Sequence, residues 1–464
     1  MTSLRPLCLL FLASLSQGLG AAEPAEPDWG RIGLTPERLD PDYWLTRAPA
    51  GERALLSAHA IVERNERLLR TEPSMVHWPS WPASLPREDI RRRIETLTGR
   101  LGTPLFKNAD TEIEQAEIDA WLDNRALERI EASNDRLFGL VVKRAAVRRL
   151  PTSQRAFDRN GGIDIDRLQE SALFPGTPVA VLHESRDGHW LFVQAESYAG
   201  WVETDTVGIA PRAEVMRYAA RQPRRYITGN QVRTVHHPYA KEVSELRMDM
   251  GASFPLRTDW PLSKPVNGQG ALGAWIVDVP LRLDNGLLHI KPALIPRAAD
   301  TAAAPLPASQ PNLIRQAFKF LGERYGWGHD YQGRDCSGFV SEIYRSIGIL
   351  LPRNTGDQAR SAAFERIAFG PELGRAERLA RLKQLRIGDL VFIPGHVMLV
   401  VGHDEFGPWV IHDAHRSALM VDGRLVALPM NGVGVTPLLP MALSEKRLYA
   451  DAVTAVQRIL PDGG

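Results

Sequence analysis

The sequence Asp335-Cys336-Ser337-Gly338-Phe339-Val340 joins a cysteine to the start of an apolar periodic segment. Apolar residues recur at helical spacing from Phe339 to Ile347, which predicts a helix with Cys336 at or near its N-terminus. A thiol acts as a nucleophile when it ionises, and the positive end of a helix favours the thiolate. Asp335 opposes that ionisation, although its carboxylate could also pair with a substrate ammonium group. The segment therefore predicts a thiol nucleophile, and the plainer alternative is a buried structural cysteine.

A base for this thiol is expected in two strands further along the chain. Residues 390–393 read as a strand, Pro394-Gly395 as a turn, and His396 begins a returning strand. His412 lies 16 residues after His396, where a polar group could orient the imidazole of the base. Asp413 and His415 are near neighbours of His412, so the sequence leaves the identity of this third residue open.

Four short motifs in this region resemble the NlpC-type cysteine peptidases, which cut peptidoglycan stem peptides. They are Asp-Cys-Ser-Gly-Phe-Val at 335–340, Gly-Asp-Leu-Val-Phe at 388–392, Gly-His-Val at 395–397 and Val-Ile-His at 410–412. The resemblance implies a papain-like α+β peptidase domain at residues 311–464. The order of segments before it resembles a subgroup with a helical N-terminal unit and two bacterial SH3-like barrels.

The resemblance implies catalytic roles for three residues and no cofactor or metal. Cys336 would be the nucleophile, His396 the general base and His412 the orienting residue. The implied enzyme is a γ-D-glutamyl-L-diamino acid endopeptidase. Its substrate would begin with a free L-Ala, and the bond between D-Glu and the diamino acid would be cut.

Five further residues are expected to contact the substrate. Tyr325 would border the nucleophile, and Asp335 and Ser337 would recognise the free amine and the D-glutamyl group. Arg353 follows Leu-Pro in a segment that resembles a cleft-lining part of the family, although a solvated loop is the plain alternative. Tyr198 is expected to lie on the wall of the first barrel that faces the site.

The rest of the chain divides into segments that differ in composition and in apolar periodicity. Residues 1–21 have a basic start, a short apolar run and small residues, which predicts a signal peptide. Residues 28–135 read as a helical domain, 136–215 as a small β-barrel, 216–297 as a second β-rich stretch, and 298–310 as an Ala- and Pro-rich linker. The resemblance implies that the second stretch is also an SH3-like barrel. Residues 152–172 read as a loop inserted in the first barrel, and Asn285-Gly286 predicts a type I′ turn in the second.

The composition of the chain argues against several classes of partner and of structural feature. Lys and Arg number 56 against 55 Asp and Glu, which lacks the basic excess of nucleic-acid-binding proteins. No stretch is long and apolar enough to predict a membrane span. Of two cysteines, Cys8 falls in the predicted signal peptide, so no internal disulfide is expected, and the histidines show no compact zinc spacing. We expect a periplasmic or secreted monomer that binds peptidoglycan stem peptides or muropeptides.

Two other classes of function fit the same sequence. The Cys-His pair could perform amidase or acyl-transfer chemistry on wall peptides. Alternatively, the barrels could anchor a non-catalytic protein on the cell wall. Products that depend on Cys336 would separate both enzymes from the binding protein.

Overall fold

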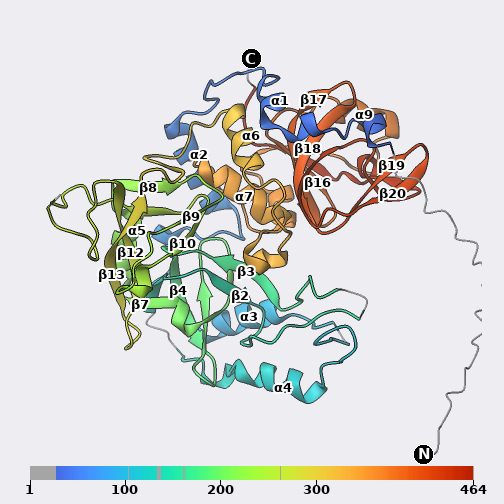
Figure 1. Ribbon diagram of the computed structural model, residues 1–464. Coiled ribbons are helices and arrows are strands. Elements are labelled where there is room, and N and C mark those ends of the chain that lie inside the picture. The colour runs from blue at the N-terminus through green and yellow to red at the C-terminus, as the bar shows by residue number, and fades with distance from the viewer. Residues whose placement is uncertain (1–27, 103, 133–136, 160–161, 262, 463–464) are drawn as a thin grey trace, which may run out of the picture.

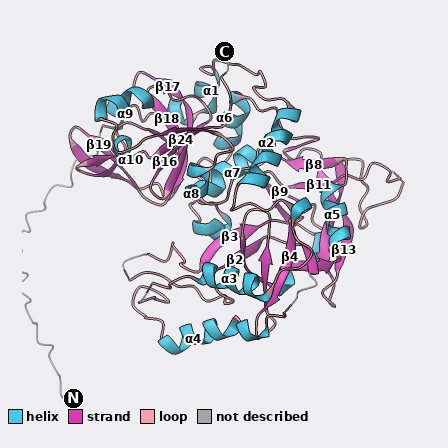
Figure 2. Ribbon diagram, turned by 180° about the vertical axis from the view of Figure 1, so that it is seen from behind, coloured by secondary structure: helices cyan, strands magenta, loops and turns pink. Residues whose placement is uncertain are grey.

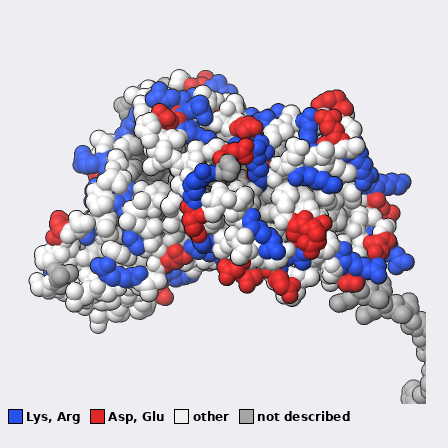
Figure 3. Space-filling model, turned by 90° about the horizontal axis from the view of Figure 1, so that it is seen from above, with Lys and Arg blue, Asp and Glu red and all other residues white. Residues whose placement is uncertain are grey.

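The computed structural model describes residues 28–102, 104–132, 137–159, 162–261 and 263–462 (Figure 1). The predicted signal peptide, residues 1–21, lies outside these ranges. Helices form the N-terminal region, β-rich segments follow, and a sheet flanked by helices forms the C-terminal part (Figures 1 and 2). None of the described helices is long and apolar enough to cross a membrane. Acidic and basic side chains are interspersed on the face that Figure 3 shows.

The helices of the N-terminal region divide between three hydrophobic clusters, the smallest of which contains Ile118 of the last helix. These helices are α1 (Pro41–Leu45), α2 (Ala58–Thr71), α3 (Arg87–Thr98) and α4 (Gln115–Asn124). Trp44 and Ile61 are buried in the C-terminal core, whereas Ile90 and Ile94 are buried in the core of the first β segment. A short amphipathic helix buries one face, so each of these helices packs on the nearest larger element. The segment predicted as one helical domain is therefore shared between its neighbours.

The first β segment is a seven-stranded antiparallel sheet in the order β3-β2-β6-β5-β4-β1-β7. Its strands are β1 (Leu137–Val141), β2 (Ala145–Arg148), β3 (Gln169–Leu173), β4 (Pro178–Glu184), β5 (Trp190–Gln194), β6 (Ala199–Glu203) and β7 (Val207–Ala210). Strand β3 lies at the end of the stretch 152–172, which the sequence predicted to be a loop. That prediction was wrong at residues 169–172. The segment Gln-Glu-Ser-Ala-Leu forms a strand that pairs with β2, although its polar pattern did not predict one.

The second β segment consists of small sheets around a shared core, after helix α5 (Arg212–Ala220). Its strands are β8 (Arg224–Ile227), β9 (Gln231–Arg233), β10 (Arg247–Asp249), β11 (Ser253–Pro255), β12 (Ala274–Arg282), β13 (Leu288–Pro296) and β14 (Thr301–Ala302). The predicted β12–β13 hairpin is present, but φ is positive at Gly286 and not at Asn285, so the turn is not type I′. Strand β14 pairs with β8, so the predicted linker 298–310 contains a strand that its Ala-rich composition concealed.

The C-terminal part is built on a six-stranded sheet in the order β15-β24-β16-β17-β18-β21. Its strands are β15 (Glu365–Ala368), β16 (Asp389–Ile393), β17 (His396–Asp404), β18 (Gly407–Ala414), β21 (Gly432–Pro437) and β24 (Ala455–Arg458), with the small pairs β19 (Ser417–Val421)–β20 (Arg424–Leu428) and β22 (Ala442–Ser444)–β23 (Arg447–Leu448). The helices are α6 (Gln310–Phe318), α7 (Cys336–Ser346), α8 (Thr355–Arg360), α9 (Arg375–Leu382) and α10 (Tyr449–Ala452).

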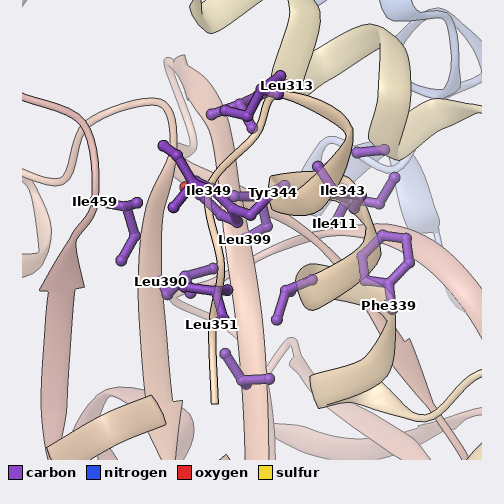
Figure 4. Packing of buried hydrophobic residues seen from close by; sticks show 14 of the residues in the cluster. Leu313, Phe339, Ile343, Tyr344, Ile349, Leu351, Leu390, Leu399, Ile411 and Ile459 are labelled. Atoms are coloured by element: carbon purple, nitrogen blue, oxygen red, sulfur yellow. The ribbon is translucent and has the colours of Figure 1, made fainter. Parts of the chain in front are cut away.

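Helix α7 packs on one face of this sheet. Phe339 and Ile343 of α7 meet Leu399 of β17 and Ile411 of β18 in the core (Figure 4). Side chains alternate between the two faces of a strand, and Met398 accordingly joins the cluster on the opposite face. This arrangement brings the first residue of α7 to the strands β17 and β18.

Candidate active site

Cys336 is the first residue of α7, and Asp335 caps this helix. Asp335 Oδ1 accepts a hydrogen bond from the Gly338 amide at 2.8 Å, which satisfies one of the free N–H groups of the first turn. The Cys336 side chain is nearly buried, and its Sγ lies 3.6 Å from Thr355 Oγ1 at the start of α8. The predicted position of the thiol at a helix start thus matches the structure.

The environment of the thiol disfavours its ionisation. Burial, together with the negative charge of Asp335, raises the pKa of the Cys336 thiol to about 12, although hydrogen bonds from Thr355 and from the Val397 amide act in the opposite direction. The sequence had predicted a lowered pKa from the helix dipole. The structure gives the opposite direction because desolvation of the thiolate dominates. A base must therefore remove the proton as the thiol attacks.

His396, His412 and Thr436 form a hydrogen-bonded chain across β17, β18 and β21. His396 Nε2 lies 2.8 Å from His412 Nδ1, and His412 Nε2 lies 3.0 Å from Thr436 Oγ1. The Thr436 hydroxyl donates to Met441 Sδ, so its oxygen accepts from His412 Nε2–H. His412 Nδ1 then accepts from His396 Nε2–H. This network assigns an unprotonated Nδ1 to His396, so this nitrogen is free to accept a proton.

Both imidazoles are neutral in this environment. Burial lowers the pKa of His396 to about 4. Burial and the neighbouring His396 lower the pKa of His412 well below its usual value. Among the described residues, the thiol bonds to Thr355 and His396 bonds to His412, so thiol and imidazole share no direct hydrogen bond. Catalytic hydrogen bonds are often long before substrate binds, so this geometry does not exclude the pair.

Arg353 is buried beside the nucleophile and joins two parts of the chain. Its Nη2 donates to Asp335 Oδ2 at 2.6 Å, and its Nη1 donates to Ser337 Oγ at 2.9 Å. Its Nε donates to Ser171 Oγ of strand β3 at 2.7 Å. Burial alone would raise the pKa of Asp335, but Arg353, His329 and the helix amides bring it down to about 2. Arg353 is thus no solvated loop residue, and Asp335 is a fully paired carboxylate.

A chain of buried charges continues from Arg353 into the second β segment. His329 Nδ1 accepts from Arg353 Nη2 at 2.9 Å, and its Nε2 lies 3.2 Å from Glu342 Oε1. Arg334 donates to Glu342 at 2.7 Å and to Asp249 of β10 at 3.2 Å. Buried charges need partners, so this network fixes how the segments dock on α7.

Strand β3 and the β5–β6 turn supply the wall opposite α7. The Tyr198 hydroxyl donates to Glu170 Oε2 at 2.5 Å. Burial and the Glu170 carboxylate raise the pKa of Tyr198, and the charges of Arg353 and Asp335 also act on it. Burial raises the pKa of Glu170 as well, against the hydrogen bond from Tyr198. Tyr198 therefore lies where the sequence placed it, near the residues around the thiol.

Tyr325 is buried at the other side of the thiol. Burial raises its pKa, and the neighbouring Cys336, Asp335 and Asp413 add to this effect. Its amide donates to the Asn431 carbonyl at 3.0 Å, and its ring centroid is 5.9 Å from that of His415. Tyr325, Asp335, Ser337, Arg353 and Tyr198 are therefore gathered around Cys336 at the start of α7. His396 and His412 are bonded to each other on β17 and β18, and the amide of Val397, next to His396, bonds to the thiol.

The two rivals of His412 have other neighbours. Asp413 follows it on β18 and points to the opposite face, as strand geometry requires. Its carboxylate is fully buried, and neither oxygen has a hydrogen-bond partner among the described residues. Burial and the charges of Asp335 and Glu323 raise the pKa of Asp413 well above its usual value. His415 lies 3.3 Å from Asp164. Of the three, His412 alone bonds to His396.

Several contacts around the site escaped the sequence analysis, and they involve Glu170, Ser171, His329, Thr355 and Thr436. Glu170 and Ser171 lie in the polar strand that was read as a loop. Thr436 is 24 residues from His412 and meets it only through the pairing of β18 with β21. No local pattern marks these residues. Among the described residues, no group of three or more His, Cys, Asp or Glu side chains could hold a metal ion.

Comparisons with known proteins agree with this architecture. Residues 322–422 match the NlpC/P60 family, and residues 154–203 match an SH3 domain of the SH3b1 type. A γ-D-glutamyl-L-lysine dipeptidyl-peptidase from Bacillus cereus is 33% identical over 137 residues, 29% of this chain and 33% of the relative. Peptidoglycan endopeptidase RipB from Mycobacterium tuberculosis is 29% identical over 168 residues, 31% of this chain and 60% of that protein. The chain thus spans between a third and three fifths of these relatives.

One solved structure resembles most of the chain. It is an NlpC/P60 endopeptidase from Photobacterium damselae subsp. piscicida, with a TM-score of 0.69 over 88% of this chain and 94% of the other. The identity is 17%, so this likeness concerns the fold. The predicted family and multidomain fold class are confirmed, whereas a second SH3-like barrel at 216–297 stays a prediction. The C-terminal part of this chain is a domain of the NlpC/P60 family, and an SH3 domain of the SH3b1 type precedes it.

Proposed function

We propose that this protein hydrolyses peptide bonds of peptidoglycan with Cys336 as the nucleophile. The observation that carries this proposal is the hydrogen-bonded chain from Thr436 through His412 to His396, which leaves Nδ1 of His396 unprotonated. His396 precedes Val397, whose amide bonds to the Cys336 thiol. Relatives of the C-terminal domain are named as peptidoglycan endopeptidase and dipeptidyl-peptidase, which supports a wall peptide as substrate.

The proposed reaction proceeds through an acyl-enzyme. When substrate draws thiol and imidazole together, His396 Nδ1 takes the thiol proton while Sγ attacks the amide carbon. Backbone N–H groups at the start of α7 can stabilise the oxyanion, an effect worth roughly 10²–10³ in rate per donor. His396 then returns the proton to the leaving amine, and water hydrolyses the thioester. His412 holds His396 in the required tautomer and orientation.

We further propose cleavage between D-Glu and the diamino acid of a peptide with a free N-terminal L-Ala. A free ammonium group needs a carboxylate that retains acceptor capacity. Asp335 is occupied by Arg353, Ser337 and the helix amides, so Glu170 with Tyr198 offers the better contact. Asp335 and Ser337 would border the glutamyl group and hold Arg353 in place. Since this substrate lies outside the cytoplasmic membrane, the protein would act in the periplasm or after secretion.

The test is mass spectrometry of defined muropeptides incubated with the protein and with Cys336→Ala. Release of L-Ala-D-Glu by the wild type and not by the variant is the expected result. His403→Ala is a matched control, because His403 lies on the same strand but bonds to the Leu385 carbonyl. Glu170→Gln should raise KM for the free-amine peptide. Cleavage of another wall bond would overturn the proposed specificity, and no cleavage by folded protein would overturn the peptidase itself.

A further inference from the structure

A cavity of about 570 Å³ lies between α7 and the two β-rich segments. On α7 it is lined by Gly338, Ser341, Glu342 and Arg345, which form one face of the helix and lead away from Cys336. Cys336 does not line this cavity. Arg353 and Tyr198 do, and both also belong to the surroundings of the thiol, so the cavity adjoins the active site along these two residues.

Two opposite charges face this cavity without being paired. Arg345 on α7 and Glu196 in the β5–β6 turn are both half-buried lining residues. Through their side chains, neither forms a hydrogen bond or an ion pair with any residue that the structure describes. Both residues line the same cavity, so their charges face one space. Burial raises the pKa of Glu196, and the charge of Arg345 partly offsets that effect. The other buried charges at this junction, such as Arg353 and Arg334, are fully paired.

The position of Arg345 is fixed by packing. Its aliphatic stem lies against Gly251, where an added Cβ would come within 2.8 Å of Arg345 Cγ. The φ of Gly251 is +81°, which also favours glycine. The stem is thus held by the turn between β10 and β11, and the guanidinium is available to the cavity.

The remaining lining is amphipathic. Tyr226 and Ser197 offer hydroxyl groups, whereas Trp78, Phe174 and Leu351 offer apolar surface. A volume of this size lies within the range of about 300–1,000 Å³ that is typical of small-molecule sites. An uncharged ligand would leave both charges unpaired, and an anion or a cation would leave one of them unpaired.

We propose that this cavity is a second binding site, for a short zwitterionic peptide or free amino acid. Its carboxylate binds Arg345 and its ammonium group binds Glu196. The site is distinct from the cleft that contains Cys336, and the inference does not depend on which bond the enzyme cuts. Occupation would bridge α7 and the β-rich segments across the helix that carries the nucleophile.

Titration calorimetry with the Cys336→Ala protein tests this site without turnover. The probes are L-alanine, L-Ala-L-Ala, its N-acetyl derivative and its C-terminal amide. The free dipeptide should bind, and removal of either charge should weaken binding about tenfold or more. Stronger binding of alanine than of the dipeptide would identify the ligand as a free amino acid.

Variants of the lining residues test whether the heat of dipeptide binding comes from this cavity. Arg345→Gln keeps the stem on Gly251, and Arg345→Gln and Glu196→Gln should each weaken dipeptide binding about tenfold. Arg360→Gln is the control, because the Arg360 side chain is 71% exposed and is not part of the cavity lining. Glu170→Gln, which alters the active cleft, should leave this binding intact.

Three results would overturn the inference. They are unchanged binding in both cavity variants, loss of all binding in Glu170→Gln, or no heat up to about 10 mM, which is too weak for a specific site. If Arg345→Gln does not fold, Glu196→Gln and the two blocked dipeptides still decide between these outcomes.

Discussion

Two buried carboxylates flank the nucleophile, and their surroundings differ completely. Asp335 at the start of α7 accepts bonds from Arg353, Ser337, Gly328 and the Gly338 amide. Asp413 at the end of β18 has no hydrogen-bond partner among the described residues. Consequently the pKa of Asp335 is lowered to about 2, whereas that of Asp413 is raised well above its usual value.

The difference between the two carboxylates lies in how their negative charge near the Cys336 thiol is compensated. On the α7 side, a carboxylate that opposes the thiolate is neutralised by Arg353, which also binds the first β segment through Ser171. On the β18 side, burial raises the pKa of Asp413 and favours its neutral form, which weakens the same repulsion. The ionised state of Asp335 is stabilised by its partner Arg353, whereas the protonation of Asp413 changes with pH. The two sides therefore respond to different perturbations.

The largest effect should come from Arg353→Ala, which removes the partner of Asp335. Loss of one member of a buried ion pair typically costs about 3–5 kcal/mol, because the other charge stays buried and unpaired. We expect a loss of that size in the free energy of unfolding, measured with urea, and loss of activity. Arg360→Ala at an exposed position should change stability by less than about 0.5 kcal/mol. Equal midpoints for the two variants would contradict the role of Arg353.

A smaller effect is expected on the β18 side from Thr436→Val. This change leaves His412 Nε2–H buried without an acceptor, at a cost of about 1–3 kcal/mol. The imidazole of His412 can then adopt the other tautomer, so kcat should fall about tenfold with little change in KM. Thr436→Ser retains the hydroxyl and should restore kcat. If Thr436→Ser is as slow as Thr436→Val, the hydroxyl does not position His412.

Part of this comparison could be predicted from the sequence. The segment from Asp335 to Ile347 contains its own cap and apolar period, so the helix and the place of Cys336 follow from local rules. The strand start at His396 follows from the turn before it. Glu170 could not be found, because the polar strand β3 is stabilised by pairing with β2 and not by its own pattern.

Other features depend on contacts between distant segments. The partner of Asp335 is 18 residues away, and its bond to Ser171 spans 182 residues. The choice between His412 and Asp413 depends on which face of β18 lies beside His396. That parity is set by the register in which Leu399 pairs with Ile411. The raised pKa of the thiol also required the structure, since burial outweighs the helix dipole that the sequence suggests.

The rate at which the Cys336 thiol is alkylated depends on how strongly its surroundings oppose ionisation. Because its pKa is raised to about 12, alkylation of Cys336 by iodoacetamide at pH 8 should be at least about tenfold slower than that of a free cysteine. Asp335→Asn should accelerate alkylation, because the negative charge of Asp335, which opposes the thiolate, is removed. Quantitative mass spectrometry of the Cys336 peptide measures the rate. Alkylation as fast as for free cysteine would show an ionised thiol and contradict this account.

The two carboxylates should also give the stability of the protein opposite dependences on pH. The folded pKa of Asp413 is raised, so its protonation favours the folded state, and this advantage is lost as pH rises above the unfolded value of about 3.9. Asp413→Asn should therefore gain stability relative to wild type as pH rises above 4. Asp335 has a lowered pKa, so its contribution is present above pH 4 and lost as pH falls towards 2. The destabilisation caused by Asp335→Asn should accordingly shrink over that acidic range. Urea unfolding of the three proteins between pH 3 and pH 8 measures both trends, and parallel curves would show that the two carboxylates do not differ as the structure indicates.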